Sequence, residues 1–193
     1  MKICVIGAPS TGKSVFSRKL ASQMGESGQS CELVQEYASS YIQQVGAPVY
    51  AWEQLIISIG QYLAEQKTTR HHMVTDAAAF VTYVYAQRLL PSKVDGENWP
   101  RYRHLLDVLR QTARISVQSY DVIFFLTHIF PPTNDGVRLQ EHLSLEECQG
   151  LSADIEAYLR AERAVYYPID VTKADVMSNA LHIIEKQNHK VQV

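Results

Sequence analysis

A phosphate-binding loop lies close to the start of the chain. Residues 7–14 are Gly-Ala-Pro-Ser-Thr-Gly-Lys-Ser and match the pattern G-x-x-x-x-G-K-[ST] completely. Its glycines let successive backbone N–H groups point into one concavity, which binds anions. We expect Lys13 to reach the β- and γ-phosphates of a nucleoside triphosphate and the Ser14 hydroxyl to bind Mg²⁺. The residues predicted to contact the nucleotide are Gly7, Ala8, Pro9, Ser10, Thr11, Gly12, Lys13 and Ser14.

Two carboxylates follow the next predicted strands. Residues 31–35 are predicted as the second strand, which Glu36 follows, and residues 71–76 as the third, which ends at Asp76. Ligands of open parallel α/β sheets bind at the carboxyl ends of the strands, so we expect both groups near the loop. Either carboxylate could deprotonate an acceptor hydroxyl, and Asp76 also has the position of a Mg²⁺-supporting Asp.

Each carboxylate also has simpler interpretations. Glu36 could be a solvated residue at the end of a strand, or a helix N-terminal residue favoured by the helix dipole. Asp76 could bind a substrate hydroxyl or cap a helix that starts at Ala77.

A segment with one arginine follows the fourth predicted strand, residues 120–127. We expect residues from about 128 to about 145 to form a lid. In this lid Arg138 would cover the γ-phosphate and neutralise the charge that develops on it during transfer. The alternative is an ordinary surface arginine. Lys173 follows the fifth predicted strand, where a purine ring could rest, and is assigned to nucleotide binding.

These groups need a phosphate-loop scaffold, and the sequence supplies its elements. Residues 2–6 are apolar and β-branched, as in a buried parallel strand, and residues 15–24 have apolar side chains at helical spacing. The N-terminus of that helix adds about half a positive charge beside the phosphates. The sequence therefore predicts an α/β fold of the P-loop NTPase class, a mostly parallel five-stranded sheet with helices on both faces.

Two further helices carry candidate contacts. Residues 51–70 are predicted as a long helix with Leu55, Ile56, Ile59, Tyr62 and Leu63 on one apolar stripe. Gln54, Gln61 and Gln66 are interpreted as polar helix surface, with Gln61 also a candidate for substrate contact. Residues 77–90 are predicted as a helix whose aromatic residues suit core packing, or alternatively a platform for stacking on the substrate: Phe80, Tyr83 and Tyr85.

A basic stretch interrupts a chain whose formal net charge is −2. Residues 86–118 hold six basic and three acidic residues, a net charge of +3. A solvated helix face is the simpler interpretation, and a surface for a polyanionic acceptor such as DNA, through the basic 101–114 helix, is the alternative. The basic residues are Arg88, Lys93, Arg101, Arg103, Arg110 and Arg114.

Length and composition favour one domain over residues 1–193. Cys4, Cys31 and Cys148 are odd in number and match no metal spacing, so we expect free thiols in a reducing cytoplasm. We see no signal peptide, and no apolar run approaches the ~20 residues that a membrane span needs. The oligomeric state stays open.

Taken together, the sequence resembles the phosphate-loop small-molecule kinases. The similarity is greatest to the ribosylnicotinamide kinase domain of the bacterial NAD-biosynthesis regulator and to related phage and bacterial AAA-like ATPase/kinase proteins. The matching residues are 7–14, Glu36-Tyr37, Asp76, Tyr120-Asp121-Val122 and Asp135-Gly136-Val137-Arg138.

The resemblance implies transfer of the γ-phosphate of ATP, with Mg²⁺, to a hydroxyl of a nucleoside or nucleotide. Glu36 would be the base or a substrate ligand, Asp76 a magnesium or substrate carboxylate, and Arg138 the lid arginine. Ala77-Ala78-Ala79 stands where the family often has a second polar group after the Asp. Phage kinases acting on a hydroxymethyl pyrimidine in DNA have a similar outline, and a non-catalytic nucleotide switch is a third hypothesis.

Overall fold

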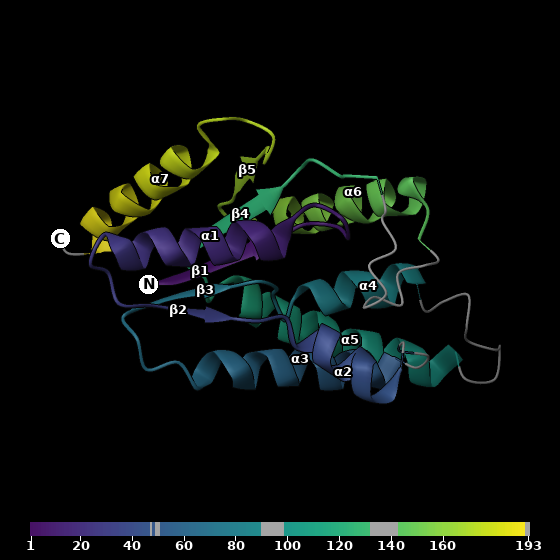
Figure 1. Cartoon of the computed structure of the whole chain (residues 1–193). Coiled ribbons are helices and arrows are strands. Elements are labelled where there is room, and N and C mark those ends of the chain that lie inside the picture. Colours follow the sequence, from purple (N-terminus) through teal and green to yellow (C-terminus); the bar gives the residue numbers. More distant parts are fainter. Residues whose placement is uncertain (47, 49–50, 90–98, 132–142, 192–193) are drawn as a thin grey trace.

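The computed structural model describes residues 1–46, 48, 51–89, 99–131 and 143–191 (Figure 1). In these ranges strands and helices largely alternate along the chain, as in other α/β folds. In chain order the elements are β1 (Lys2–Ile6), α1 (Lys13–Glu26), β2 (Cys31–Val34), α2 (Tyr37–Val45), α3 (Ala51–Gln66), β3 (His72–Thr75), α4 (Val81–Leu89), α5 (Trp99–Val117), β4 (Val122–Leu126), α6 (Leu145–Ala161), β5 (Tyr167–Ile169) and α7 (Val176–Val191).

The strands form one sheet in the order β2-β3-β1-β4-β5, and every pairing between them is parallel. Cys4 in the central strand β1 lies opposite Thr75 on one side and Ile123 on the other. This confirms the predicted five-stranded α/β sheet. All the strands end at one edge, so the segments that follow β1, β2 and β3 meet there.

Side chains of β1 alternate between two cores because successive residues on a strand point to opposite faces. Ile3 and Val5 belong to a cluster with residues of α1 and α7, whereas Cys4 and Ile6 belong to a cluster with residues of α4, α5 and α6. Figure 1 shows α1 and α7 on one side of the sheet and α3, α4 and α5 on the other. Burial on both faces accounts for the uninterrupted apolar sequence of β4.

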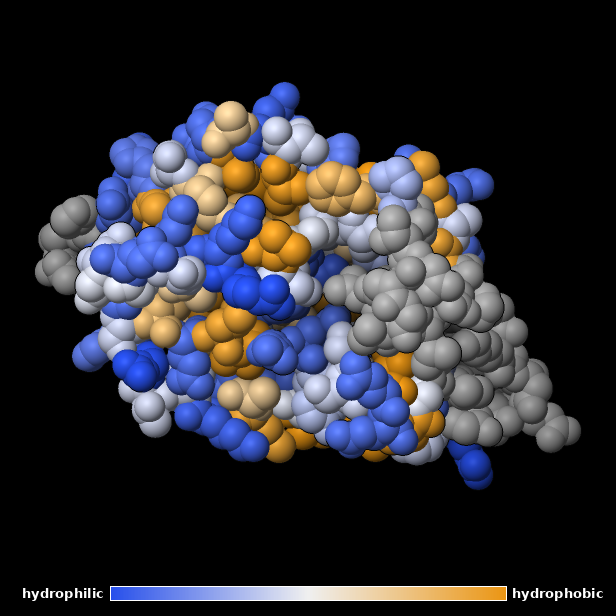
Figure 2. Space-filling model, viewed as in Figure 1, coloured by the Kyte–Doolittle hydropathy of each residue, from blue (hydrophilic) through white to orange (hydrophobic). Residues whose placement is uncertain are grey.

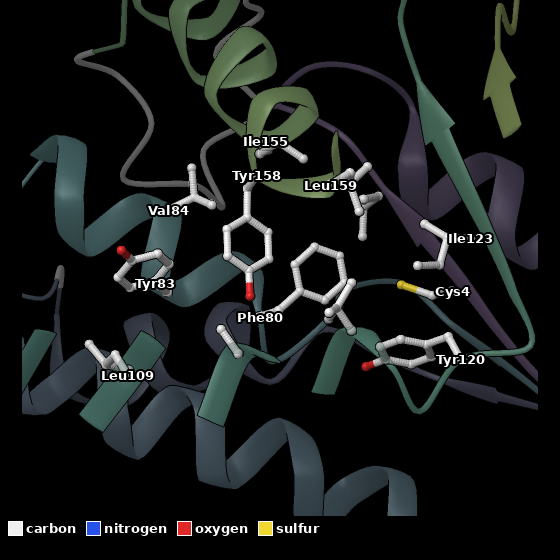
Figure 3. Packing of buried hydrophobic residues seen from close by; sticks show 14 of the residues in the cluster. Cys4, Phe80, Tyr83, Val84, Leu109, Tyr120, Ile123, Ile155, Tyr158 and Leu159 are labelled. Atoms are coloured by element: carbon white, nitrogen blue, oxygen red, sulfur yellow. The ribbon is translucent and has the colours of Figure 1, made fainter. Parts of the chain in front are cut away.

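Two aromatic residues of the segment 77–90, Phe80 and Tyr83, are part of the core. Phe80 is fully buried and stacks on Tyr158, with ring centroids 5.7 Å apart and an interplanar angle of 18°. Tyr83 meets the same ring edge-on, and Phe80 lies between Tyr158 and Tyr120 in Figure 3. The core interpretation is therefore confirmed for Phe80 and Tyr83, which are too buried to stack on a substrate, whereas Tyr85 is only partly buried.

The boundaries of the elements test one expectation and show two further local features. The helix expected from Ala77 begins at Val81, so the helix-cap interpretation of Asp76 is wrong. Pro168 lies in β5, an edge strand, where a missing N–H costs no sheet hydrogen bond. Ser144 caps α6, and its hydroxyl accepts a hydrogen bond from the backbone N–H of Glu147. None of the helices in the described ranges is long and apolar enough to cross a membrane.

Candidate active site

The phosphate loop adopts backbone conformations that its glycines allow. Gly12 has φ +80° and occupies the N-cap position of α1. A Cβ on Gly7 would lie 2.9 Å from both the Leu126 carbonyl oxygen and the Thr11 hydroxyl, too close for any side chain. The loop therefore needs glycine at both motif positions, for a left-handed turn at one and for a close backbone approach at the other.

Internal hydrogen bonds hold the loop against its neighbours. The Thr11 hydroxyl and the Lys13 ammonium each donate to the carbonyl oxygen of Ala8, both at 2.9 Å. The backbone N–H of Phe130 donates to the carbonyl oxygen of Ser10 at 2.8 Å. Since α1 begins at Lys13, its N-terminal N–H groups and its dipole point towards the loop.

Asp76 lies beside this loop, as the sequence predicts. Its side chain is almost completely buried, and the Ser17 hydroxyl of α1 lies 3.4 Å from one carboxylate oxygen. Burial raises the pKa of Asp76, while hydrogen bonding from Ser14 and the charge of Lys13 act in the opposite direction. The negative charge of Glu36 also contributes to raising the pKa of Asp76, so the structure brings these four groups together.

Glu36 is half-buried at the start of α2. It has the extended backbone of an N-cap residue, but its side chain caps no backbone N–H. Instead, one carboxylate oxygen accepts a 2.8 Å hydrogen bond from the Ser39 hydroxyl. Among the residues that the structure describes, the other carboxylate oxygen of Glu36 has no hydrogen-bond partner.

The residues at the loop also fit a magnesium ion. Mg²⁺ prefers hard oxygen ligands and usually takes only one or two from the protein, the rest coming from phosphates and water. The Ser14 hydroxyl and the Asp76 carboxylate supply such oxygens on adjoining elements. The described part of the chain holds no group of three or more His, Cys, Asp or Glu that could bind a metal by itself.

Two other predicted site residues are Arg138 and Lys173. Arg138, with most of the predicted lid, lies outside the described residues. The Lys173 side chain is 70% exposed, and its ammonium lies 4.0 Å from a carboxylate oxygen of Asp170. The nucleotide-binding role of Lys173 stays a prediction.

The buried polar face of α3 was missed by sequence reasoning. Gln54 and Gln61, interpreted as helix surface, are 7% and 2% exposed. From Gln54 onward, the polar residues on this buried face recur every three or four positions, which is the signal that could have revealed it. They are Glu53, Gln54, Ser58, Gln61 and Glu65.

Acidic neighbours offset part of the basic stretch. Arg88 pairs with Asp154 at 2.6 Å, and Arg114 pairs with Glu162 at 3.0 Å. These pairs favour the interpretation of the stretch as an ordinary solvated surface.

Comparisons with known proteins agree with this fold. A family model described as an AAA domain matches residues 2–177, which is nearly the whole chain. No curated protein matched the chain.

Solved structures share the fold. The NadR protein in complex with NAD and AMP-PNP superimposes with a TM-score of 0.68 at 20% sequence identity, over 96% of this chain and 49% of the NadR chain. Deoxyadenosine kinase from M. mycoides, solved with dCMP and a flexible dCDP, gives a TM-score of 0.64 at 14% identity over 99% of this chain and 100% of the kinase chain. The present chain thus spans about half the length of NadR. The predicted resemblance to the NAD-biosynthesis regulator is confirmed.

Proposed function

Because the chain belongs to the AAA domain family, we propose that it is an ATP- and Mg²⁺-dependent kinase that phosphorylates a hydroxyl of a nucleoside, a nucleotide or a related small molecule. The observation that carries this proposal is the convergence of two carboxylates, Asp76 and Glu36, on the Lys13-Ser14 end of the phosphate loop. A second carboxylate near the loop can accept the proton of an attacking hydroxyl. The solved relatives with bound nucleotides support the same class of ligand.

In this mechanism the acceptor oxygen attacks the γ-phosphorus in line with the leaving oxygen of ADP. A new P–O bond forms, the bond between the γ-phosphorus and the β–γ bridging oxygen breaks, and the acceptor proton passes to a carboxylate. Lys13 neutralises charge on the transferred group, and the loop N–H groups hold the phosphates. Catalysis of this kind depends mainly on positioning, so no covalent intermediate is needed.

The two carboxylates have separate roles in the proposal. Asp76 and Ser14 would hold Mg²⁺, which would neutralise negative charge on the phosphates of ATP. Glu36 would accept the proton of the acceptor hydroxyl through the carboxylate oxygen that does not bond to Ser39. Asp76 as the base is the alternative, which mutation can decide.

The remaining expectations belong to the same proposal. Residues 1–193 would act as one cytoplasmic kinase domain with a lid at about 128–145, in which Arg138 covers the γ-phosphate. Lys173 would lie beside the base of ATP.

Transfer of radiolabelled γ-phosphate to a panel of acceptors tests the proposal. The panel contains nucleosides, nucleotides, and DNA with and without hydroxymethyl pyrimidines. Label on a free nucleoside or nucleotide, lost in the Lys13→Ala variant, is the expected result. Label on DNA alone would instead support a DNA kinase acting through the 101–114 helix, and hydrolysis without any labelled acceptor would support a nucleotide switch.

A further inference from the structure

One buried amide joins the two strand ends that carry the site carboxylates. Gln61 is 2% exposed, and its Oε1 accepts a 2.8 Å hydrogen bond from the backbone N–H of Tyr37. Its Nε2 donates to the Thr75 hydroxyl at 2.9 Å and lies 3.4 Å from Glu65 Oε1. Tyr37 directly follows Glu36, and Thr75 directly precedes Asp76.

The bridge needs an amide at this position. A backbone N–H can only donate, so the oxygen of Gln61 must face Tyr37 and its nitrogen must face Thr75. The Thr75 hydroxyl gives its own proton to the carbonyl oxygen of Ala77 at 2.8 Å, which leaves its oxygen free to accept from Gln61. Each contact therefore fixes the orientation of the next.

Glu65, the third partner of Gln61, is itself anchored. It is 4% exposed and accepts a 2.8 Å hydrogen bond from the Tyr120 hydroxyl. Burial, together with the nearby charge of Glu65, raises the pKa of Tyr120 well above its ordinary value, so this phenol remains a donor. The Lys2 ammonium lies 2.9 Å from the other carboxylate oxygen of Glu65. A buried polar network with all its members paired is rigid.

We propose that Gln61 is a positioning residue, which sets the distance between Glu36 and Asp76 by linking the backbone at Tyr37 to the end of β3. The kinetic part of this inference rests on the proposed function. The side-chain oxygen and nitrogen of Gln61 both form hydrogen bonds with other groups of the protein. Gln61 therefore acts through the two carboxylates rather than on the substrate. A displacement of about 1 Å at a reacting group can cost on the order of 100-fold in rate.

Gln61→Leu removes all three contacts, and Thr75→Val removes one of them while keeping the β-branched shape that suits a strand. Gln66→Leu, on the exposed end of the same helix, is the matched control. Hydrogen exchange of the Tyr37 amide is measured in each variant, with kcat and the KM for ATP under labelled-transfer conditions.

We expect faster exchange at Tyr37 in both bridge variants and a 10- to 100-fold lower kcat, with the KM for ATP within about twofold of wild type. Unchanged exchange at Tyr37 in folded Thr75→Val would overturn the bridge, and unchanged kcat in an active enzyme would overturn its positioning role. Hydrogen exchange does not depend on catalysis. A wild-type protein without transfer activity would therefore refute the proposed function, while exchange of the Tyr37 amide would still test the Gln61 bridge.

The opposite face of α3 carries an independent observation. Ile56, Ile59, Tyr62 and Leu63 lie at helical spacing and are between 40% and 52% exposed. The sequence predicts them on one apolar stripe, yet only Leu55 of that stripe packs against the core. In Figure 2 hydrophobic residues reach the surface along the lower edge of the molecule, the edge that α3 occupies in Figure 1.

This face also has no charge. No exposed residue between Trp52 and Gln66 is Asp, Glu, Lys or Arg, whereas Glu53 and Glu65 of the same helix are buried. A helix surface that faces water in a monomer normally carries charged residues. The polarity of α3 is thus reversed, with its acidic groups inside and its large aliphatic residues outside.

We infer that a second copy of this chain covers α3, with the two helices packed across a twofold axis. A twofold interface brings the same surface patch of both subunits together. Because the exposed residues of α3 carry no charge, the two copies of this patch do not repel one another. The four side chains expose on the order of 400 Å² per protomer, within the range of patches that are often functional. That area is suited to the apolar centre of an interface that buries about 800 Å² per partner, with polar neighbours as the rim.

Sedimentation velocity from about 1 to 100 μM tests this inference. We expect a wild-type dimer and a monomer for Ile59→Asp and Leu63→Asp. Val165→Asp, a change at a 70% exposed apolar residue ahead of β5, should leave the dimer intact. A monomeric wild type over the whole range, or a dimer that survives both α3 substitutions in folded protein, would overturn it.

Discussion

The backbone N–H of Phe130 and the carbonyl oxygen of Ser10 form a 2.8 Å hydrogen bond. Ser10 belongs to the phosphate loop and has φ +62°, a conformation that non-glycine residues rarely adopt. Phe130 lies in the first residues after β4, where the predicted lid begins. The loop and the start of that segment are therefore bonded to one another directly.

This contact predicts that nucleotide binding protects Phe130. Adding a non-hydrolysable ATP analogue with Mg²⁺ at about 100 times its Kd should slow hydrogen exchange of the Phe130 amide by up to ~100-fold, because opening the loop then also costs the binding free energy. Exchange at Phe130 that is unaffected, while the loop amides become protected, would show that the two segments open independently.

Lys13→Ala should lower γ-phosphate transfer by about 100-fold or more, since one preorganised charge on the transferred group is typically worth that much. The matched control is Lys19→Ala, which removes an exposed lysine from the same helix and should leave transfer unchanged. Circular dichroism verifies that both variants fold. Full activity of folded Lys13→Ala would refute the site assignment.

Glu36→Gln tests the identity of the base. If Glu36 accepts the proton, this variant should lose about 10²- to 10⁴-fold in kcat with little change in the KM for ATP. Glu32→Gln, in β2, is the control. A small loss in Glu36→Gln would refute Glu36 as the base and leave Asp76 as the alternative, because Asp76→Asn is expected to lose activity in either role.

Asp76→Asn should stabilise the protein at neutral pH even as it abolishes activity. Burial raises the pKa of Asp76 in the folded state, so the stability that its neutral form provides is present at low pH and is lost as pH rises through the folded pKa. The amide variant avoids this loss. We expect a higher Tm than wild type at pH 7–8 and a difference that shrinks towards pH ~4, the ordinary value of an aspartate.

Gly60→Ala should destabilise the protein, because an added Cβ would overlap the Tyr37 ring. Overpacking of this kind costs about 1–3 kcal/mol in unfolding free energy. Gly25→Ala provides the comparison, since a Cβ at that helical glycine meets nothing within 4 Å. Urea denaturation should show Gly25→Ala neutral or more stable by up to ~1 kcal/mol. Equal effects at the two positions would contradict this packing of α2 on α3.

Much of the site was predictable because its signals are local. The phosphate loop is eight contiguous residues whose backbone conformation follows from glycine and from the flanking strand and helix. Glu36 and Asp76 could be assigned to one edge because parallel strands all end on the same side. The alternation of strands and helices likewise determined the fold class.

The tertiary structure alone decided which face of each element is buried. A helical period of 3.6 residues divides α3 into an apolar and a polar face, but it does not say which one meets the protein. The sheet and its neighbouring helices cover the polar face, because Gln61 and Glu65 find partners on Tyr37, Thr75, Tyr120 and Lys2. Those partners are 14 to 63 residues away in the sequence, and only folding brings them within hydrogen-bonding distance.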